Sequence, residues 1–151
     1  MKVAVGADHA GFELKGDIVK WLESEGHQVN DIGAHELDPD DDYPDFAVAV
    51  AGSVLKGDSE RGIVICGSGV GACITANKVN GIRACLCHDT YSARQGVEHD
   101  NMNVVCIGGR VIGIELTKVV LESFLNANFL PEPRFQRRLD KLNQVEQNGL
   151  P

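Results

Sequence analysis

The sequence lacks any apolar run close to the roughly 20 residues that a membrane-spanning helix requires. It also lacks a charged leader followed by an apolar stretch, because Met1-Lys2 leads directly into a short β-branched run. We therefore expect a cytoplasmic protein with no membrane partner.

Basic residues are the minority, with 14 Lys and Arg against 22 Asp and Glu and a formal charge of −8. Nucleic acids and anionic membranes are bound by basic faces, so neither is expected as the main partner. Positive charge gathers only near the C-terminus, where Arg134, Arg138 and Lys141 share a face of a predicted helix. That pattern is typical of a solvated helix and equally of an anion-binding one.

The five cysteines are odd in number and lie mostly inside apolar strands. We therefore expect reduced core thiols and not a disulfide framework. We expect Cys85 and Cys87 to share one strand face and to pack as small hydrophobic residues. Together with His88 they do not have the spacing of a structural zinc site, and no metal is expected.

Short apolar strands alternate with helices along the chain. Strands are expected at 3–7, 27–32, 63–65, 82–87 and 104–107. The alternation predicts an α/β protein with a three-layer Rossmann-like fold and a five-stranded parallel sheet. At 151 residues we expect one domain, 1–151, in which 128–151 is a C-terminal tail or helix. The polar segment 33–45 is expected to be solvated surface, since its carboxylates have no fixed spacing: Glu36, Asp38, Asp40, Asp41, Asp42 and Asp45.

Residues 62–78 are expected to form a buried strand, a glycine turn and a helix. Gly67, Gly69 and Gly71 allow positive φ and let an anion approach the backbone N–H groups at a helix start. Cys66 stands at the mouth of this turn, where the helix N-terminus favours a thiolate. The pairs Asp8-His9 and Gly109-Arg110 also follow strand ends, where ligands bind in parallel sheets. We therefore expect the active site at this edge.

The same turn also satisfies a dinucleotide pattern from Gly67 to Ala72, with Asp89 about 20 residues further on, where a ribose-binding carboxylate belongs. This alternative predicts an NAD-dependent oxidoreductase. Against it, the turn follows the third strand, and no separate substrate domain is evident.

A set of motifs, in order and spacing, resembles the type B ribose-5-phosphate isomerase family, which includes galactose-6-phosphate isomerase subunits. The resemblance extends from position 1 to about 146. Its motifs are Asp8-His9-Ala10-Gly11, Asp42-Tyr43-Pro44, the stretch 62–71, Ala76-Asn77-Lys78, Gly81-Ile82-Arg83-Ala84, Gly108-Gly109-Arg110 and the stretch 134–138.

The resemblance implies an aldose–ketose isomerase that works through an enediolate, without metal or dinucleotide cofactor. It implies that Cys66 is the base, that His99 opens the sugar ring, and that Ser68 relays a proton. The backbone of the turn would hold the enediolate oxygen. That turn comprises Gly67, Gly69, Val70 and Gly71.

Further residues are assigned by the same resemblance. Asp8, counted with the catalytic group, and Tyr43 would bind sugar hydroxyls. The phosphate would be held by His9, Arg110, Arg134 and Arg138, with the tail arginines supplied by the neighbouring subunit of a homodimer or dimer of dimers.

Three positions depart from common family patterns. Ala72 replaces a glutamate that serves as the base in another branch, Asp100 replaces a frequent asparagine, and Phe135 replaces a frequent histidine. The expected substrate is ribose 5-phosphate, with allose, galactose or erythrose phosphate as alternatives. A phosphosugar-binding protein without catalysis is a further alternative, which would not require Cys66 and His99.

Overall fold

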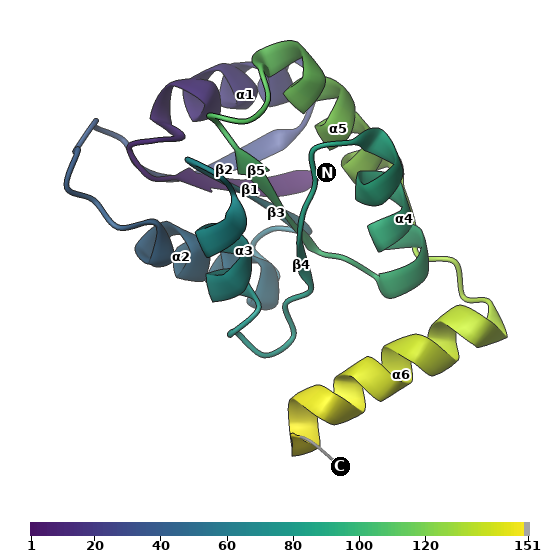
Figure 1. Cartoon of the computed structure of the whole chain (residues 1–151). Coiled ribbons are helices and arrows are strands. Elements are labelled where there is room, and N and C mark those ends of the chain that lie inside the picture. The colour runs from purple at the N-terminus through teal and green to yellow at the C-terminus, as the bar shows by residue number, and fades with distance from the viewer. Residues whose placement is uncertain (150–151) are drawn as a thin grey trace.

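The computed structural model describes residues 1–149, and its strands and helices alternate as the sequence predicts (Figure 1). The strands are β1 (Lys2–Ala7), β2 (Gln28–Gly33), β3 (Arg61–Cys66), β4 (Ala84–Leu86) and β5 (Val104–Gly108). The helices are α1 (Phe12–Ser24), α2 (Tyr43–Leu55), α3 (Val70–Ala76), α4 (Thr90–Asp100), α5 (Ile114–Asn126) and α6 (Pro133–Asn148). Positions 150 and 151 of the expected tail lie outside the described residues.

The strands form one parallel sheet in the order β2-β1-β3-β5-β4. Alternate residues of the central strands enter two separate cores. Val3 and Ile63 join the core beneath α1, α4 and α5, whereas Ala4 and Val64 join the core beneath α2 and α3. Burial on both faces explains why the strands are almost continuously apolar. The predicted three-layer α/β fold is confirmed.

The order in which strands are added to the sheet reverses next to β1. After β1 it runs outward to β2 and then returns to β3 on the other side of β1. The connections from β1 and β3 therefore leave in opposite directions, which opens a crevice beyond the carboxyl ends of these strands. Asp8 follows β1, and Cys66 is the last residue of β3.

Strand β4 is shorter than the predicted 82–87 because side chains replace the sheet at its start. The N–H of Arg83 donates to the Asn103 side-chain oxygen at 2.8 Å, and the N–H of Ala84 donates to that of Asn77 at 2.9 Å. The Arg83 N–H is thereby bonded to a side chain instead of to β5, and the register with β5 covers residues 84–86.

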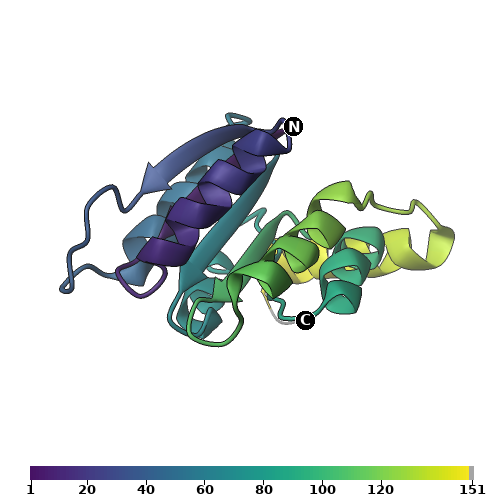
Figure 2. The same cartoon turned by 90° about the horizontal axis from the view of Figure 1, so that it is seen from above.

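Helix α6 lies at the margin of the molecule and packs on α4, as both views show (Figures 1 and 2). Phe135 and Leu139 are its buried residues, and the rest of the helix is largely exposed. The N–H of Gly81 donates to the Glu146 carboxylate at 2.7 Å and anchors its far end. Across residues 1–149, no helix combines the length and the apolar character needed to cross a membrane.

Candidate active site

A cavity of about 430 Å³ lies at the carboxyl ends of β1, β3 and β5. Most of the predicted site residues meet in it, including the Cys66 thiol, the Ser68 hydroxyl and the basic side chains of His9 and Arg110. Its lining comprises Asp8, His9, Ala10, Tyr43, Cys66, Gly67, Ser68, Gly71, Arg110 and Val111. The structure thus brings together residues from four segments at the crevice that the strand order creates.

The Cys66 thiol is buried at the end of β3, with 4% of the residue exposed. The N–H of Gly69 points at its sulfur with an N···Sγ distance of 3.1 Å. Gly69 has φ of +79°, and a Cβ there would stand 2.4 Å from Leu86 Cδ1 and 2.9 Å from the Ile107 carbonyl carbon. Only glycine fits this position, and its N–H is aimed at a sulfur that would carry negative charge as a base.

The turns after β3 and β5 are tied to each other. The N–H of Gly109 donates to the Cys66 carbonyl at 2.8 Å, and the N–H of Arg110 donates to the Gly67 carbonyl at 3.0 Å. These bonds continue the register in which Cys66 faces Gly108. Arg110 is therefore fixed over the glycine turn by its own backbone.

Gly71 lies directly against Tyr43, which begins α2. A Cβ at position 71 would meet Tyr43 Cζ at 2.5 Å and the phenol oxygen at 2.9 Å. We predict that Gly71→Ala displaces the Tyr43 ring and lowers kcat/KM roughly 10²-fold, because a shift of about 1 Å near a reacting group has that cost.

The measurement is steady-state kinetics together with a thermal melt. Gly52→Ala in α2 is the matched control, since a Cβ there meets nothing within 4 Å. That control should keep full activity and gain about 0.4–1 kcal/mol of stability. Unchanged kinetics in Gly71→Ala would show that activity does not depend on the place of the Tyr43 ring against Gly71.

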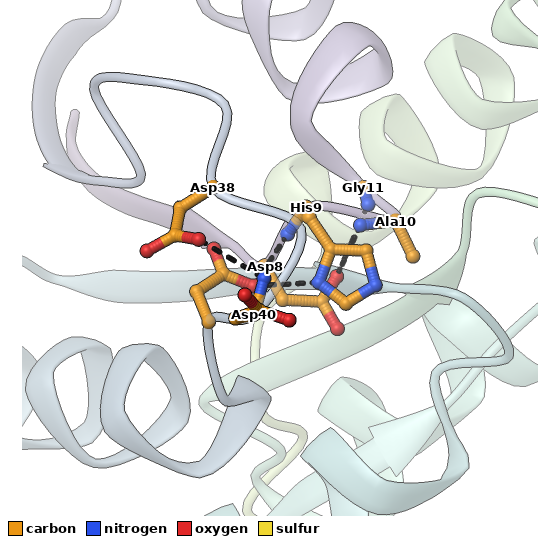
Figure 3. Close-up of polar contacts among 7 residues, drawn as sticks. Asp8, His9, Ala10, Gly11, Asp38 and Asp40 are labelled. Atoms are coloured by element: carbon orange, nitrogen blue, oxygen red, sulfur yellow. Dashed lines mark hydrogen bonds and ion pairs between the residues drawn. The ribbon is translucent and has the colours of Figure 1, made fainter.

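The Asp8 carboxylate is buried and bound to the start of α1. Its Oδ1 accepts the N–H of Ala10 at 3.0 Å and that of Gly11 at 3.1 Å (Figure 3). Burial raises the pKa of the Asp8 carboxyl, and the Gly11 hydrogen bond and the nearby His9 offset part of the rise. Asp8 thus shapes the turn and also lines the cavity.

His9 is held by Asp41, a residue that sequence reasoning placed on solvated surface. The distance from His9 Nδ1 to Asp41 Oδ1 is 2.7 Å, and the Asp41 side chain is only 11% exposed. The expectation for 33–45 was therefore wrong at Asp41, whereas Asp38 and Asp40 of the same loop are exposed. No signal distinguished Asp41 from its acidic neighbours, because its role depends on a residue 32 positions away.

A second group of predicted site residues lies outside this cavity, on α4 and α6. The His99 ring stacks on Phe135 with 3.9 Å between centroids and 18° between planes. The Arg134 guanidinium carbon lies 4.4 Å from the same Phe135 ring centre. Arg138 is exposed on α6. Within one chain, the structure therefore does not bring His99, Arg134 or Arg138 to Cys66.

Phe135 and Gln95 fix the orientation of His99. Phe135 is 1% exposed, so the imidazole rests on a ring that is locked in the α4–α6 contact. The distance from Gln95 Nε2 to His99 Nδ1 is 2.8 Å. With the amide nitrogen as donor, Nδ1 is the acceptor, and the neutral ring carries its proton on Nε2.

Asp100 and Cys85 line a larger cavity of about 810 Å³ between α4, β4 and α6. The expectation that Cys85 packs like Cys87 was wrong, because Cys85 is exposed in this cavity whereas Cys87 is 1% exposed in the core. On the strand face that Cys85 and Cys87 share, only the Cys87 side chain is buried. Among the described residues, no three His, Cys, Asp or Glu side chains form a group that could hold a metal ion.

Cys73 on α3 is a second thiol with altered chemistry. A hydrogen bond from Cys106 lowers the pKa of Cys73 to about 7, against the opposing effect of burial. The amide of Asn77 also lies 3.6 Å from its sulfur. A thiol with a pKa this low is more readily converted to the thiolate than an ordinary cysteine.

Asp89, which the dinucleotide alternative requires for a ribose, caps α4 instead. Its Oδ1 accepts the N–H of Ser92 at 2.7 Å, and this bond lowers the pKa of the Asp89 carboxyl. A side chain used as a helix cap is a sufficient reason for an aspartate at this position.

Comparison with known proteins adds the family. The Ribose/Galactose Isomerase family model matches residues 3–142. The chain is 43% identical over 129 residues to D-erythrulose-4-phosphate isomerase of Pectobacterium atrosepticum, covering 85% of each chain. It is 42% identical over 146 residues to ribose-5-phosphate isomerase B of Escherichia coli, covering 97% of each.

A solved structure of ribose-5-phosphate isomerase B from Mycoplasma genitalium with bound ribulose-5-phosphate superposes with a TM-score of 0.91 at 39% identity, covering 97% of each chain. The fold, the cavity and these matches define a sugar-phosphate isomerase. More narrowly, the chain belongs to the Ribose/Galactose Isomerase family. The resemblance seen in the motifs is confirmed, and the oxidoreductase and non-catalytic alternatives are set aside.

Proposed function

We propose that this enzyme interconverts ribose 5-phosphate and ribulose 5-phosphate through an enediolate, with Cys66 as the base. The contact that carries the proposal is the Gly69 N–H aimed at the Cys66 sulfur, 3.1 Å away, inside a cavity that also holds Ser68 and Arg110. Relatives that act on ribose 5-phosphate, and one that holds ribulose-5-phosphate, support the choice of sugar.

The proton on C2 of an open-chain aldose is weakly acidic, so a positioned base and an acceptor of negative charge are both needed. Cys66 takes the proton from C2 and returns it to C1. The Ser68 hydroxyl moves a proton between O1 and O2. The Gly69 N–H is directed to the Cys66 sulfur, and the N–H groups of Gly67 and Gly71 are proposed to receive the developing oxyanion. Ala72 is fully buried and has no acidic group, which leaves Cys66 as the base.

The sugar enters as a ring, and His99 is the group proposed to open it. In this step the ring C–O bond breaks as the imidazole gives a proton to the ring oxygen and takes the proton that the C1 hydroxyl releases, so His99 ends in the protonation state in which it began. The Gln95 contact at Nδ1 holds the ring in orientation for this exchange at Nε2. Asp8 and Tyr43 would hold hydroxyls. His9 and Arg110 would bind the phosphate with Arg134 and Arg138, far from the reacting carbons.

The separation of the two residue groups supports a shared site. Cys66 and Arg110 line the cavity, whereas His99, Arg134 and Arg138 lie on α4 and α6 of the same chain and do not. We propose that a second copy supplies these residues, so that residues 1–151 act as one isomerase domain in a homodimer or a dimer of dimers. The 128–151 segment would then pack on the partner.

The direct test is turnover of a panel of phosphorylated sugars of four, five and six carbons. We expect the highest kcat/KM for ribose 5-phosphate and lower values for erythrose 4-phosphate, allose 6-phosphate and galactose 6-phosphate. The readout is ketose formation, with enzyme-free incubations as controls.

Preference for the four-carbon sugar would leave the reaction intact and overturn the choice of substrate. This outcome has a specific basis, since a relative at 43% identity is a D-erythrulose-4-phosphate isomerase. Absence of turnover with every sugar in the panel would contradict the mechanism.

A further inference from the structure

The contact between His9 and Asp41 joins two loops at the rim of the cavity. One oxygen of Asp41, Oδ1, lies 2.7 Å from the His9 ring nitrogen Nδ1 and accepts the His9 backbone N–H at 2.9 Å. The same carboxylate oxygen therefore holds both the backbone of His9 and its imidazole ring. Nε2 is consequently the nitrogen that His9 has free for a ligand in the cavity (Figure 3).

Because the Asp41 carboxylate is mostly buried, its negative charge needs a positive charge nearby. The Asp41 side chain is 11% exposed, and its other oxygen, Oδ2, is buried with no hydrogen-bond partner among the described residues. A carboxylate with a buried, unsatisfied oxygen is costly unless a positive charge lies beside it. His9 is the cation-forming group in contact with it.

We propose that Asp41 is a positioning residue that holds His9 as an imidazolium, with Nδ1–H donated to Asp41 and Nε2–H directed to the dianionic phosphate of the substrate. This inference rests on the proposed function, in which His9 is a phosphate ligand. It adds a residue that acts through His9 and does not touch the sugar.

The charged groups around His9 determine the direction in which its pKa shifts. The hydrogen bond to the Asp41 carboxylate raises the pKa of His9 above that of a free histidine, and the charge of Asp8 adds to the rise while burial opposes it. His9 therefore keeps its charge to a higher pH than a free histidine, and phosphate binding weakens as pH rises through the raised value. The other titratable or charged groups of the cavity are Tyr43 from α2, Cys66 from β3 and Arg110 from the turn after β5.

The test compares Asp41→Asn with Asp40→Asn. Each variant removes one negative charge from the same loop, but Asp40 is exposed and does not contact His9. The ring of His9 is followed by NMR titration of ¹⁵N-histidine-labelled protein, with His9→Gln to assign its signals. We expect the pKa of His9 to fall in Asp41→Asn and to stay near wild type in Asp40→Asn.

Kinetics with ribose 5-phosphate give the second readout. In Asp41→Asn we expect KM to rise about tenfold at a pH between the lowered pKa of His9 in the variant and its raised pKa in wild type, and to approach wild type at a pH below both, with kcat little changed. Asp41→Glu keeps the negative charge and should restore most of the raised pKa, which also covers the case in which Asp41→Asn folds poorly.

An unchanged pKa of His9 in Asp41→Asn, or a KM increase that is independent of pH, would overturn the inference. If the pKa falls as expected but no phosphorylated sugar is turned over by wild type, the pair stands as described and the proposed function fails. The two failures are thus distinguishable.

Discussion

Cys66→Ala is expected to lower kcat by roughly 10²–10⁴-fold with little change in KM, because a positioned base acts on the transition state and not on ground-state binding. Alanine fits the space, since Cys66 is buried in the core beneath α2 and α3 and loses only its sulfur. The measurement is steady-state isomerase activity with a thermal melt to confirm folding.

Cys85→Ala is the matched control, because it removes an exposed thiol that lines the other cavity. It should retain wild-type kinetics. A Cys66→Ala enzyme as active as wild type would refute the base assignment. Alkylation is a poorer test than substitution, since Cys73, with its pKa lowered to about 7, would react with the same reagents.

Mixing two inactive variants is expected to restore activity if the site is shared between copies. Cys66→Ala removes the proposed base from one chain, and Arg138→Ala removes a proposed phosphate ligand on α6 of the other. Random pairing makes half of the dimers mixed, and half of the sites in each are then intact, so about a quarter of wild-type activity should return. The proteins are unfolded together, refolded and assayed.

The control for mixing uses two residues that line the same cavity of one chain, Cys66 and Arg110. A mixture of Cys66→Ala and Arg110→Ala can form no intact site and should stay inactive. Mixed dimers confirmed by mass spectrometry that show no recovery with Arg138→Ala would mean that α6 does not complete a partner's site.

The fold was predictable because the strands are buried on both faces. Val3 and Ala4, or Ile63 and Val64, are all apolar because each faces a different helical layer. The edge strand was less predictable, since its length depends on the side chains of Asn77 and Asn103, which replace the sheet. Such a replacement has no periodic signal.

The candidate site was predictable to the extent that its residues stand at strand ends. Cys66 ends β3, Asp8 and Arg110 come just after β1 and β5, and parallel strands bring such positions to one edge. The pairing of Asp41 with His9 was not, because six similar carboxylates in one loop give no indication which of them folds inward. The exposure of Cys85 likewise depends on which part of an edge strand a distant helix covers.

The cavity is assembled from the ends of β1, β3 and β5, so its parts come from positions 8, 66 and 110 of the chain. No partly folded form that lacks one of these strands can present the whole site. Ligand affinity and folding are therefore thermodynamically linked through the entire sheet. At a free ligand concentration a hundred times Kd, the folded state gains about 2.7 kcal/mol relative to the unfolded chain. A sugar phosphate bound in this cavity would therefore stabilise the whole sheet and not only the loops around it.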